Sequence, residues 1–355
     1  MPESGVSLAS LSTLGIGGPA RHYVRVESAE AVLEAARWAK TRSLPLLVLG
    51  GGSNLVVSDE GFAGLVLHVA IRGVDARPTD GAVELTAGAG EAWDPLVARA
   101  VAEGWAGIEC LSGIPGLVGA TPMQNVGAYG QDVSETITRV RAADLTGGAI
   151  VDLAAAECGF GYRDSRFKRE DRGRYVVLAV TYRLRPGGAP SVRYPDIERA
   201  LAERGVASPA LSDVRQAVIE VRRRKSMVID PADPNHRSVG SFFMNPVVGP
   251  ARAEQIEAGL RRDGTLAPAD RMPSFPASDG RRKLSAAWLI ERSGLARGHR
   301  RGNAGISTRH TLAIVNCGGA TAREVVALAR EIRDRVRERF GVTLVPEPVL
   351  VGLEL

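Results

Sequence analysis

Cysteine and aromatic residues are scarce in this chain of 355 residues. The three cysteines, Cys110, Cys158 and Cys317, stand far apart, and no C-x-x-C pair occurs, so neither a zinc site nor a disulfide framework is expected. Such cysteine usage is typical of a reducing compartment. Aromatic residues make up 5% of the chain. Many nucleic-acid-binding surfaces interleave aromatic residues, which stack on bases, with basic residues. In this chain the aromatic residues are not interleaved with the basic runs.

Long apolar runs are also missing. No stretch reaches the ~18 apolar residues of a membrane-spanning helix, and the opening MPESGVSLAS lacks the basic-then-apolar order of a secretory signal. We therefore expect a cytoplasmic protein without membrane insertion. The 45 basic and 40 acidic residues are interspersed, and the basic runs at 222–225, 281–283 and 297–301 are interpreted as solvated faces. The basic excess leaves a non-catalytic nucleotide- or nucleic-acid-binding protein as one alternative.

Hydrophobic periodicity predicts helices and strands without regular alternation, which is typical of α+β domains. In the helix expected at 322–340, Thr321 and Glu324 form a capping box and Gly341 ends the helix. Further helices are expected at 28–40 and 93–101. Strands are expected at 44–49, 55–57, 65–69, 175–184 and 342–345. Loops or turns are expected at 112–130 (with a short helix), 185–190, 230–238 and 266–280.

A triple glycine, in LLVLGGGSNLVV, follows the strand expected at 44–49. A dinucleotide-binding Rossmann loop would need a helix after its glycines. Here the strand-like Leu55, Val56 and Val57 follow, so the Rossmann interpretation fails on context. Glycines and a serine between two strands still offer backbone N–H groups that a phosphate can approach closely. A tight turn without a ligand is the alternative.

A second glycine-rich stretch, SGIPGLVGATPMQNVGAYG, covers residues 112–130. Its glycines stand among the possible donors Ser112, Thr121, Gln124 and Asn125. Two such loops in one domain could line opposite sides of one long, phosphate-containing cofactor. The chain has no G-x-x-x-x-G-K-[ST] loop, so an NTPase is not expected.

Both loops, with TLGIGG at 13–18 and FGYRDSRFK at 160–168, make the chain resemble the UDP-N-acetylenolpyruvoylglucosamine reductases. The loops alone resemble the wider class of vanillyl-alcohol-oxidase-type FAD domains, whereas GYRDS, GSFFMNP and the closing PEPVLVG narrow the resemblance to the reductases, in their longer subtype with a tyrosine loop. The resemblance spans residues 11–352. It implies an α+β fold with a vanillyl-alcohol-oxidase/PCMH-type FAD-binding domain and a C-terminal α+β substrate-binding domain. The implied boundaries are 1–78 and 79–222 for two FAD-binding α+β subdomains, 223–343 for the substrate domain, and 344–355 for a segment returning to the active site.

The resemblance also implies an activity. FAD would take a hydride from NADPH and pass it to UDP-N-acetylglucosamine enolpyruvate, giving UDP-N-acetylmuramate for peptidoglycan synthesis. Related oxidases often tether flavin through a histidine near the first loop; LLVLGGGSN has none, so noncovalent FAD is expected. The expected partners are the UDP-sugar and NADPH, without nucleic acid, and a monomer is expected. An FAD-dependent alcohol or sugar-lactone oxidase is the alternative, against which the Ser241 and Glu347 motifs argue.

Reducing an enol ether conjugated to a carboxylate requires a clamp for developing negative charge and a proton donor beside it. The resemblance implies that Arg163 and Glu347 are the clamp and that Ser241 is the donor. The context V-G-S-F-F of Ser241 is not the G-x-S-x-G elbow of a hydrolase. Many relatives carry a second acid where this chain has Val345. The structural alternatives are an Arg163–Asp164 ion pair, a solvated Glu347 and a buried Ser241.

Ligand contacts follow from the same resemblance. Tyr194 would close over the substrate, and Lys225 and Asn245 would lie near the UDP diphosphate, where an ammonium group suits the charge. His310 stands where relatives carry glutamine or histidine. The expected FAD-binding residues are Gly50, Gly51, Gly52, Ser53, Asn54, Leu55, Ser112, Pro115, Gly116, Gly119, Ala120, Gln124, Asn125, Gly127, Tyr129 and Gly130.

Overall fold

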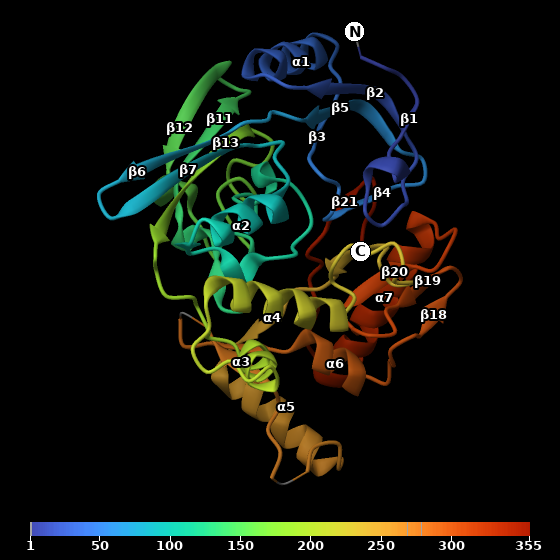
Figure 1. Cartoon of the computed structure of the whole chain (residues 1–355). Helices are drawn as coiled ribbons and strands as arrows, with labels where there is room; N and C mark the ends of the chain where they lie inside the picture. Colours follow the sequence, from blue (N-terminus) through green and yellow to red (C-terminus); the bar gives the residue numbers. More distant parts are fainter. Residues whose placement is uncertain (1, 268, 278) are drawn as a thin grey trace. The chain divides into compact units, whose positions relative to one another are not determined.

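The chain divides into two compact units in a computed structural model that describes residues 2–267, 269–277 and 279–355 (Figure 1). Each unit is assembled from segments that are separate in the sequence. The first unit comprises Met1–Leu11, Pro19–Ser53 and Gly61–Asp230. The second unit comprises Ser12–Gly18, Asn54–Glu60 and Pro231–Leu355. The first glycine loop therefore begins in one unit and ends in the other.

A largely parallel sheet forms the N-terminal part of the first unit. Its strands, in spatial order, are β1 (Val6–Ser7), β2 (Pro19–Val26), β5 (Phe62–Val69) and β3 (Leu46–Leu49). Strand β5 runs parallel to both neighbours, with Val66 opposite Tyr23 and Leu47. Helix α1 (Ala29–Thr41) connects β2 to β3 and begins at Ser28, whose hydroxyl accepts the N–H of Ala31 at 3.1 Å. The helix predicted here is confirmed.

An antiparallel sheet forms the larger core of the first unit. Its strands, in spatial order, are β12 (Ala149–Ala154), β11 (Ile137–Asp144), β13 (Tyr175–Pro186), β7 (Ala82–Gly88) and β6 (Val74–Thr79), with β8 (Trp105–Ala106) paired to the end of β13. Helix α2 (Trp93–Ala102) buries Trp93, Leu96 and Val97 in this core. Strand β13 continues into the turn predicted at 185–190, because Arg185 and Pro186 pair with β8.

Helices α3 (Pro195–Glu203) and α4 (Leu211–Arg224) complete the first unit. They form a separate small core that includes Ile197, Ala200, Val214 and Val218. The sequence patterns above predict neither helix. The loop prediction for 112–130 is confirmed in its main feature, a short 3₁₀ helix at Val118–Ala120, and the stretch also contributes strand β9 (Gly127–Ala128), which pairs with β10 (Gln131–Asp132).

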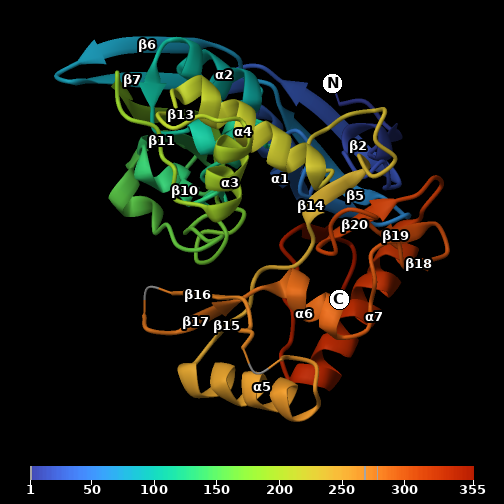
Figure 2. The same ribbon diagram turned by 60° about the horizontal axis from the view of Figure 1, so that its bottom comes forward.

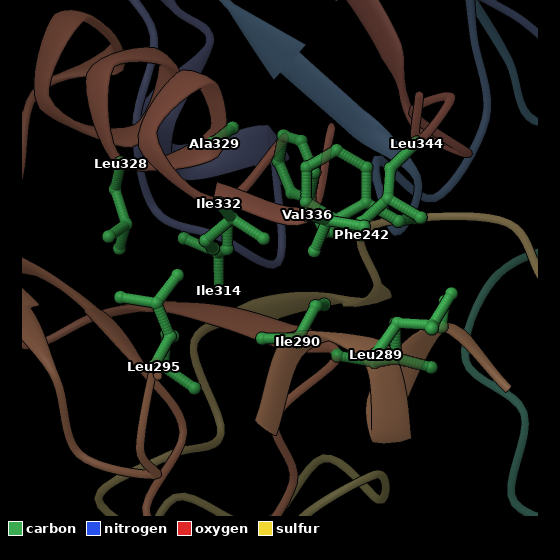
Figure 3. Close-up of a cluster of buried hydrophobic side chains, with 14 of the residues drawn as sticks. Phe242, Leu289, Ile290, Leu295, Ile314, Leu328, Ala329, Ile332, Val336 and Leu344 are labelled. Atoms are coloured by element: carbon green, nitrogen blue, oxygen red, sulfur yellow. The ribbon is translucent and has the colours of Figure 1, made fainter. Parts of the chain in front are cut away.

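The second unit packs three helices and three small sheets around one hydrophobic core in its described residues (Figures 1 and 3). Its helices are α5 (Pro250–Arg262), α6 (Ala286–Arg292) and α7 (Ala322–Phe340). One sheet has the order β14 (Ser238–Ser241), β20 (Ala313–Asn316), β19 (Ala304–Ile306) and β18 (Arg300–Arg301). A second sheet, beside α5 in Figure 2, has the order β15 (Val247–Val248), β17 (Arg282–Leu284) and β16 (Ser274–Pro276). The third pairs β4 (Leu55–Val57) with β21 (Val349–Val351) in parallel.

Helix α7 has the bounds and caps that the sequence predicts. The Thr321 hydroxyl accepts the N–H of Glu324 at 3.1 Å, the Glu324 carboxylate accepts the N–H of Thr321 at 2.9 Å, and Gly341 is left-handed. In contrast, the strand predicted at 342–345 is wrong. The backbone there forms only an isolated bridge, between Pro346 and Phe243, and the missing N–H groups of Pro346 and Pro348 delay regular pairing until β21. The loop predicted at 266–280 likewise contains the short strand β16.

The described residues contain no helix long and apolar enough to cross a membrane. They also contain no group of three or more histidine, cysteine or acidic side chains that could hold a metal ion. The three cysteines are free thiols. Burial raises the pKa of Cys110 to about 12 and that of Cys158 to about 11, so both stay protonated at neutral pH.

The cap of α7 leads to a stability prediction. Thr321→Ala removes the hydroxyl that accepts the N–H of Glu324. We expect it to lower the free energy of unfolding by about 1 kcal/mol, measured by urea denaturation. Thr321→Ser keeps the hydroxyl and is expected to stay within a few tenths of a kcal/mol of the parent. An alanine variant as stable as the serine variant would show that the cap contributes nothing.

Candidate functional site

The two glycine loops meet backbone to backbone in the first unit. A Cβ on Gly51 would lie 3.1 Å from the Cα of Gly116. Gly116 itself has a φ of +118°, and a Cβ there would lie 2.7 Å from the hydroxyl oxygen of Ser53. That hydroxyl donates to the carbonyl of Pro115 at 3.2 Å. The glycines are therefore needed for the close approach of the loops. The two loops predicted to serve one site lie in direct contact.

Polar side chains of the second loop bond it to neighbouring segments of the first unit. The buried Ser112 donates its hydroxyl hydrogen to the carbonyl of Glu109 at 2.6 Å. The side-chain amide of Asn125 donates to the carbonyl of Gly161 at 3.0 Å and accepts the N–H of Ser134 at 3.0 Å. Both residues were predicted to bind a cofactor. Because these side-chain groups are used within the protein, a cofactor would meet chiefly the backbone of Ser112 and Asn125.

Arg163 reaches into the same loop. Its guanidinium donates to the carbonyl of Asn125 at 3.4 Å and to that of Gly127, and it lies 3.8 Å from the carboxylate of Asp132. The side chain is only 20% exposed. Its backbone has a φ of +54°, a left-handed conformation that costs a non-glycine residue roughly 1–2 kcal/mol and is found mostly where the surroundings enforce it. The structure thus brings the predicted catalytic arginine to the predicted cofactor loop.

Ser241 and Glu347 lie on neighbouring segments of the second unit. Phe243 and Pro346 form an isolated antiparallel bridge, and the N–H of Glu347 donates to the carbonyl of Phe242 at 2.9 Å. Phe242 and Phe243 are 0% and 1% exposed, and Phe242 points into the core beside α7 (Figure 3). The core therefore anchors the backbone that carries the predicted proton donor and the predicted acid. The structure brings these two together.

The first glycine loop reaches this segment through Asn54. Its side-chain amide donates to the carbonyl of Glu347 at 3.3 Å, and its own carbonyl accepts the N–H of Val349 at 3.0 Å. Directly beyond, Leu55 lies opposite Val349 in the parallel pair β4–β21. Two predicted cofactor residues, Asn54 and Leu55, are thus structurally joined to the predicted catalytic Glu347.

Tyr129, Tyr194 and Lys225 form a cluster in the first unit. The two tyrosine rings pack edge to face with centroids 5.5 Å apart. The Lys225 ammonium lies 6.0 Å from the centroid of Tyr129 and forms a 2.7 Å ion pair with Asp196. Burial raises the pKa of Tyr129 to about 12 and also raises the pKa of Tyr194, so both phenols are neutral donors at physiological pH. The predicted substrate residues Tyr194 and Lys225 are therefore close together.

Asn245 and His310, the other predicted substrate residues, lie in the second unit. The side-chain oxygen of Asn245 accepts the N–H of Ala286, the first residue of α6, at 2.9 Å. The carbonyl of His310 accepts the N–H of Ala313 at 3.1 Å, and Ala313 is the residue paired with Ser241. His310 therefore stands in the turn that leads to the strand beside Ser241.

The interpretation of residues 222–225 as a solvated face is wrong for Arg222, which is buried. It is 7% exposed, it donates to the carbonyl of Met227 at 2.6 Å, and its Nε has no hydrogen-bond partner among the described residues. Burial lowers the pKa of its guanidinium. A Cβ on Gly113 would lie 3.4 Å from this Nε, so the second glycine loop leaves room for it. The sequence spacing could have indicated this burial, since residue 222 follows the buried Val218 by one helical turn.

Two family profiles match the chain. An FAD binding domain matches residues 20–154, and the C-terminal domain of UDP-N-acetylenolpyruvoylglucosamine reductase matches residues 231–351. The first match covers both glycine loops in full. Their close-packed backbones, at Gly51 and Gly116, are called the cradle below. The chain is therefore a flavoprotein by class, with an FAD-binding domain of α+β architecture.

Full-length relatives give the family. The chain is 49% identical over 359 aligned residues to UDP-N-acetylenolpyruvoylglucosamine reductase from Saccharopolyspora erythraea, covering 100% of this chain and 97% of the relative. It is 48% identical to the enzyme of that name from Thermobifida fusca, covering 99% and 98%. The crystal structure of the reductase from Thermus caldophilus superimposes with a TM-score of 0.66 at 27% identity, covering 99% of each chain. This chain belongs to the UDP-N-acetylenolpyruvoylglucosamine reductase family, and the resemblance found in its motifs is confirmed.

The glycine contacts fit an FAD dinucleotide. Gly51 and Gly116 carry no side chains of their own to cover the loop backbone, and Gly52 adds a left-handed turn with a φ of +62°. Successive backbone amides in such turns form anion-binding concavities. The Gly50–Ser53 part of the first loop and residues 112–130 would hold the cofactor within the first unit.

This cradle gives a second prediction. Gly116→Ala places a methyl group 2.7 Å from the Ser53 hydroxyl at a φ of +118°, so the backbone of residue 116 is strained and the hydroxyl must turn away from its bond to Pro115. We expect the purified variant to lose most of its flavin, measured as the ratio of visible to ultraviolet absorbance after gel filtration. The matched control is Gly249→Ala, because a Cβ on Gly249 meets no heavy atom within 4 Å. Full flavin content in a folded Gly116→Ala variant would contradict the assignment of the cradle.

Proposed function

We propose that this chain reduces UDP-N-acetylglucosamine enolpyruvate to UDP-N-acetylmuramate, with NADPH as reductant, in the synthesis of peptidoglycan precursors. The observation that carries the proposal is the full-length identity of 48–49% to reductases named for this enolpyruvyl sugar. When bound, FAD accepts a hydride from NADPH and delivers it to the enolpyruvyl group. The protein's own residues must then bind the substrate carboxylate, stabilise its added charge and supply a proton.

Arg163 is proposed to hold that carboxylate as negative charge develops on it. A guanidinium stays protonated and offers a planar pair of donors that suits a carboxylate. Two backbone carbonyls of the second glycine loop already orient this group, and its low exposure limits screening by water. Preorganised charge of this kind needs no rearrangement at the moment of reaction, which is its advantage in catalysis.

Glu347 is proposed as the second contact to the carboxylate. To donate a hydrogen bond to an anion, its carboxyl group must carry a proton. The flanking prolines restrict its backbone, and its N–H and carbonyl are bonded to Phe242 and Asn54. This fixed backbone would present the carboxyl group in a defined direction.

Ser241 is proposed as the proton donor to the carbon next to the carboxylate. It lies at the end of β14, paired with Ala313, and follows the left-handed Gly240. The next residue, Phe242, is fully buried and donates its N–H to the carbonyl of Leu312 at 2.7 Å. The serine therefore has little backbone freedom. A hydroxyl is a weak acid, so its proton would pass only to a strongly basic, enolate-like carbon held within reach.

The remaining parts of the proposal concern ligand contacts and cellular setting. Tyr194 and Lys225 would contact the UDP part of the substrate, with Asn245 and His310 as further contacts. The boundaries 1–78, 79–222 and 223–343, with 344–355 returning to the active site, remain our proposed domains. We also propose noncovalent FAD, a monomer, a cytoplasmic location and the subtype with a tyrosine loop.

The visible spectrum tests the activity directly. We expect the purified protein to be yellow, its flavin absorbance to bleach when NADPH is added without oxygen, and the colour to return when the enolpyruvyl UDP-sugar follows. NADPH without the sugar should leave the flavin reduced. If NADPH leaves the flavin oxidised, while an alcohol or a sugar lactone drives oxygen consumption, the chain is an oxidase and the proposal is wrong.

Replacement of the serine separates the two half-reactions. We expect Ser241→Ala to reduce its flavin with NADPH at the parent rate, because no proton donor is needed there. Reoxidation by the enolpyruvyl sugar should slow by ~10²–10⁴-fold, the usual contribution of a positioned acid. Ser238→Ala, in the same strand, is the matched control and should reoxidise normally. Near-normal reoxidation of Ser241→Ala in stopped-flow measurements would exclude the proton-donor role.

A further inference from the structure

Arg163 stands where a turn normally carries glycine or asparagine. Gly161 and Asp164 donate their N–H groups to each other's carbonyls at 3.0 and 3.3 Å, which makes Tyr162 and Arg163 the two central residues of a tight turn. The second central residue, Arg163, has a φ of +54°. In turns of this kind the left-handed position favours residues without a branched or bulky side chain. An arginine here therefore needs support from its surroundings.

Lys168 forms a hydrogen bond to Arg163, the residue in the unfavourable left-handed conformation. Its ammonium group donates to the main-chain carbonyl of Arg163 at 3.1 Å. No carboxylate lies within 4.0 Å of Lys168 among the described residues, so this carbonyl is the oxygen that its charge meets. A hydrogen bond from a charged donor is shorter and stronger than one between neutral groups. Lys168 thus stabilises the peptide group that leaves Arg163.

The second glycine loop holds both sides of the same turn. Before Arg163, the carbonyl of Gly161 accepts from the Asn125 side chain at 3.0 Å. After it, the fully buried Ser165 donates its hydroxyl hydrogen to the carbonyl of Met123 at 2.6 Å. These two bonds fix the ends of the turn but do not touch the Arg163 peptide group. In that peptide group the N–H of Asp164 is bonded to Gly161 within the turn at 3.3 Å, and the Arg163 carbonyl is bonded to Lys168.

We propose that Lys168 is a positioning residue for Arg163, and through it for the enolpyruvyl carboxylate. The inference rests on the proposed function, which gives Arg163 its task. Lys168 acts on the main chain and need not touch the substrate. Without its ammonium group the Arg163 peptide can rotate toward an ordinary negative φ, and this rotation redirects the guanidinium. Misplacement of a catalytic group by about 1 Å can cost ~10²-fold in rate.

A double-mutant cycle tests this dependence. The variants are Lys168→Met, Arg163→Ala and the combination of both, each purified as holoenzyme and reduced with NADPH without oxygen. The rate measured is flavin reoxidation by the enolpyruvyl UDP-sugar. We expect ~10–100-fold slowing in Lys168→Met and greater slowing in Arg163→Ala, because an indirect loss costs less than removal of the group. The combined variant should be no slower than Arg163→Ala.

Further measurements separate positioning from folding. Lys168→Arg keeps a charged donor and should recover most of the rate, and the exposed Lys40→Met is the matched control for loss of a lysine. Calorimetric titration of the oxidised holoenzymes with the enolpyruvyl sugar should show weaker binding in Lys168→Met, and the combined variant should bind no more weakly than Arg163→Ala. Flavin content and the unfolding midpoint should stay near the parent values. If Lys168→Met does not fold, Lys168→Gln takes its place in the cycle.

Two results overturn the inference. In one, reoxidation of the combined variant is slowed by the product of the two single-variant factors, which means that Lys168 acts independently of Arg163. In the other, Lys168→Met reoxidises and binds the sugar like the parent. A failure of the proposed function looks different, because the unaltered chain itself is then not reoxidised by the enolpyruvyl sugar. That result removes the task of Arg163 and overturns both proposals.

Discussion

The approach of two glycine backbones is the contact on which the proposed cofactor site of the first unit depends. Gly51 and Gly116 meet without side chains between them, and the Ser53 hydroxyl bonds the loops together beside this contact. The second loop then carries the carbonyls that receive the guanidinium of Arg163. The cradle and the proposed carboxylate clamp are therefore parts of one continuous loop structure.

A different constraint governs the second unit, where the hydrophobic core sets the positions of the polar residues. Phe242 and Phe243 are buried directly after Ser241, and their backbone bonds to the segment that carries Glu347. Tight packing of such aromatic side chains leaves a core little freedom to shift. The serine and the acid thereby gain fixed backbones from residues that have no part in the chemistry. The two phenylalanines therefore have a structural purpose beside Ser241.

Elements with local signals could be predicted well. Helix α7 has its cap and its glycine stop in the sequence, and the residues after the triple glycine form a strand, as their apolar run indicates. The strand predicted at 342–345 failed because strand pairing depends on a partner distant in sequence. That partner, β4, pairs only beyond Pro348. Helices α3 and α4 gain their stability from packing on each other, for which single-sequence periodicity is a weak guide.

The sequence by itself determined the chemistry available to this protein, because residue types in ordered motifs identify the reductase family and its candidate arginine, serine and glutamate. Only the tertiary structure decided which partners the residues around these candidates bond to and which of those residues are buried. The Asn125 side chain ties the second glycine loop to Gly161 and Ser134, Arg222 is buried rather than solvated, and Lys168 bonds to the main chain of Arg163. The physical reason is that hydrogen bonding and burial depend on groups brought together by folding, and periodicity along the chain does not record those partners.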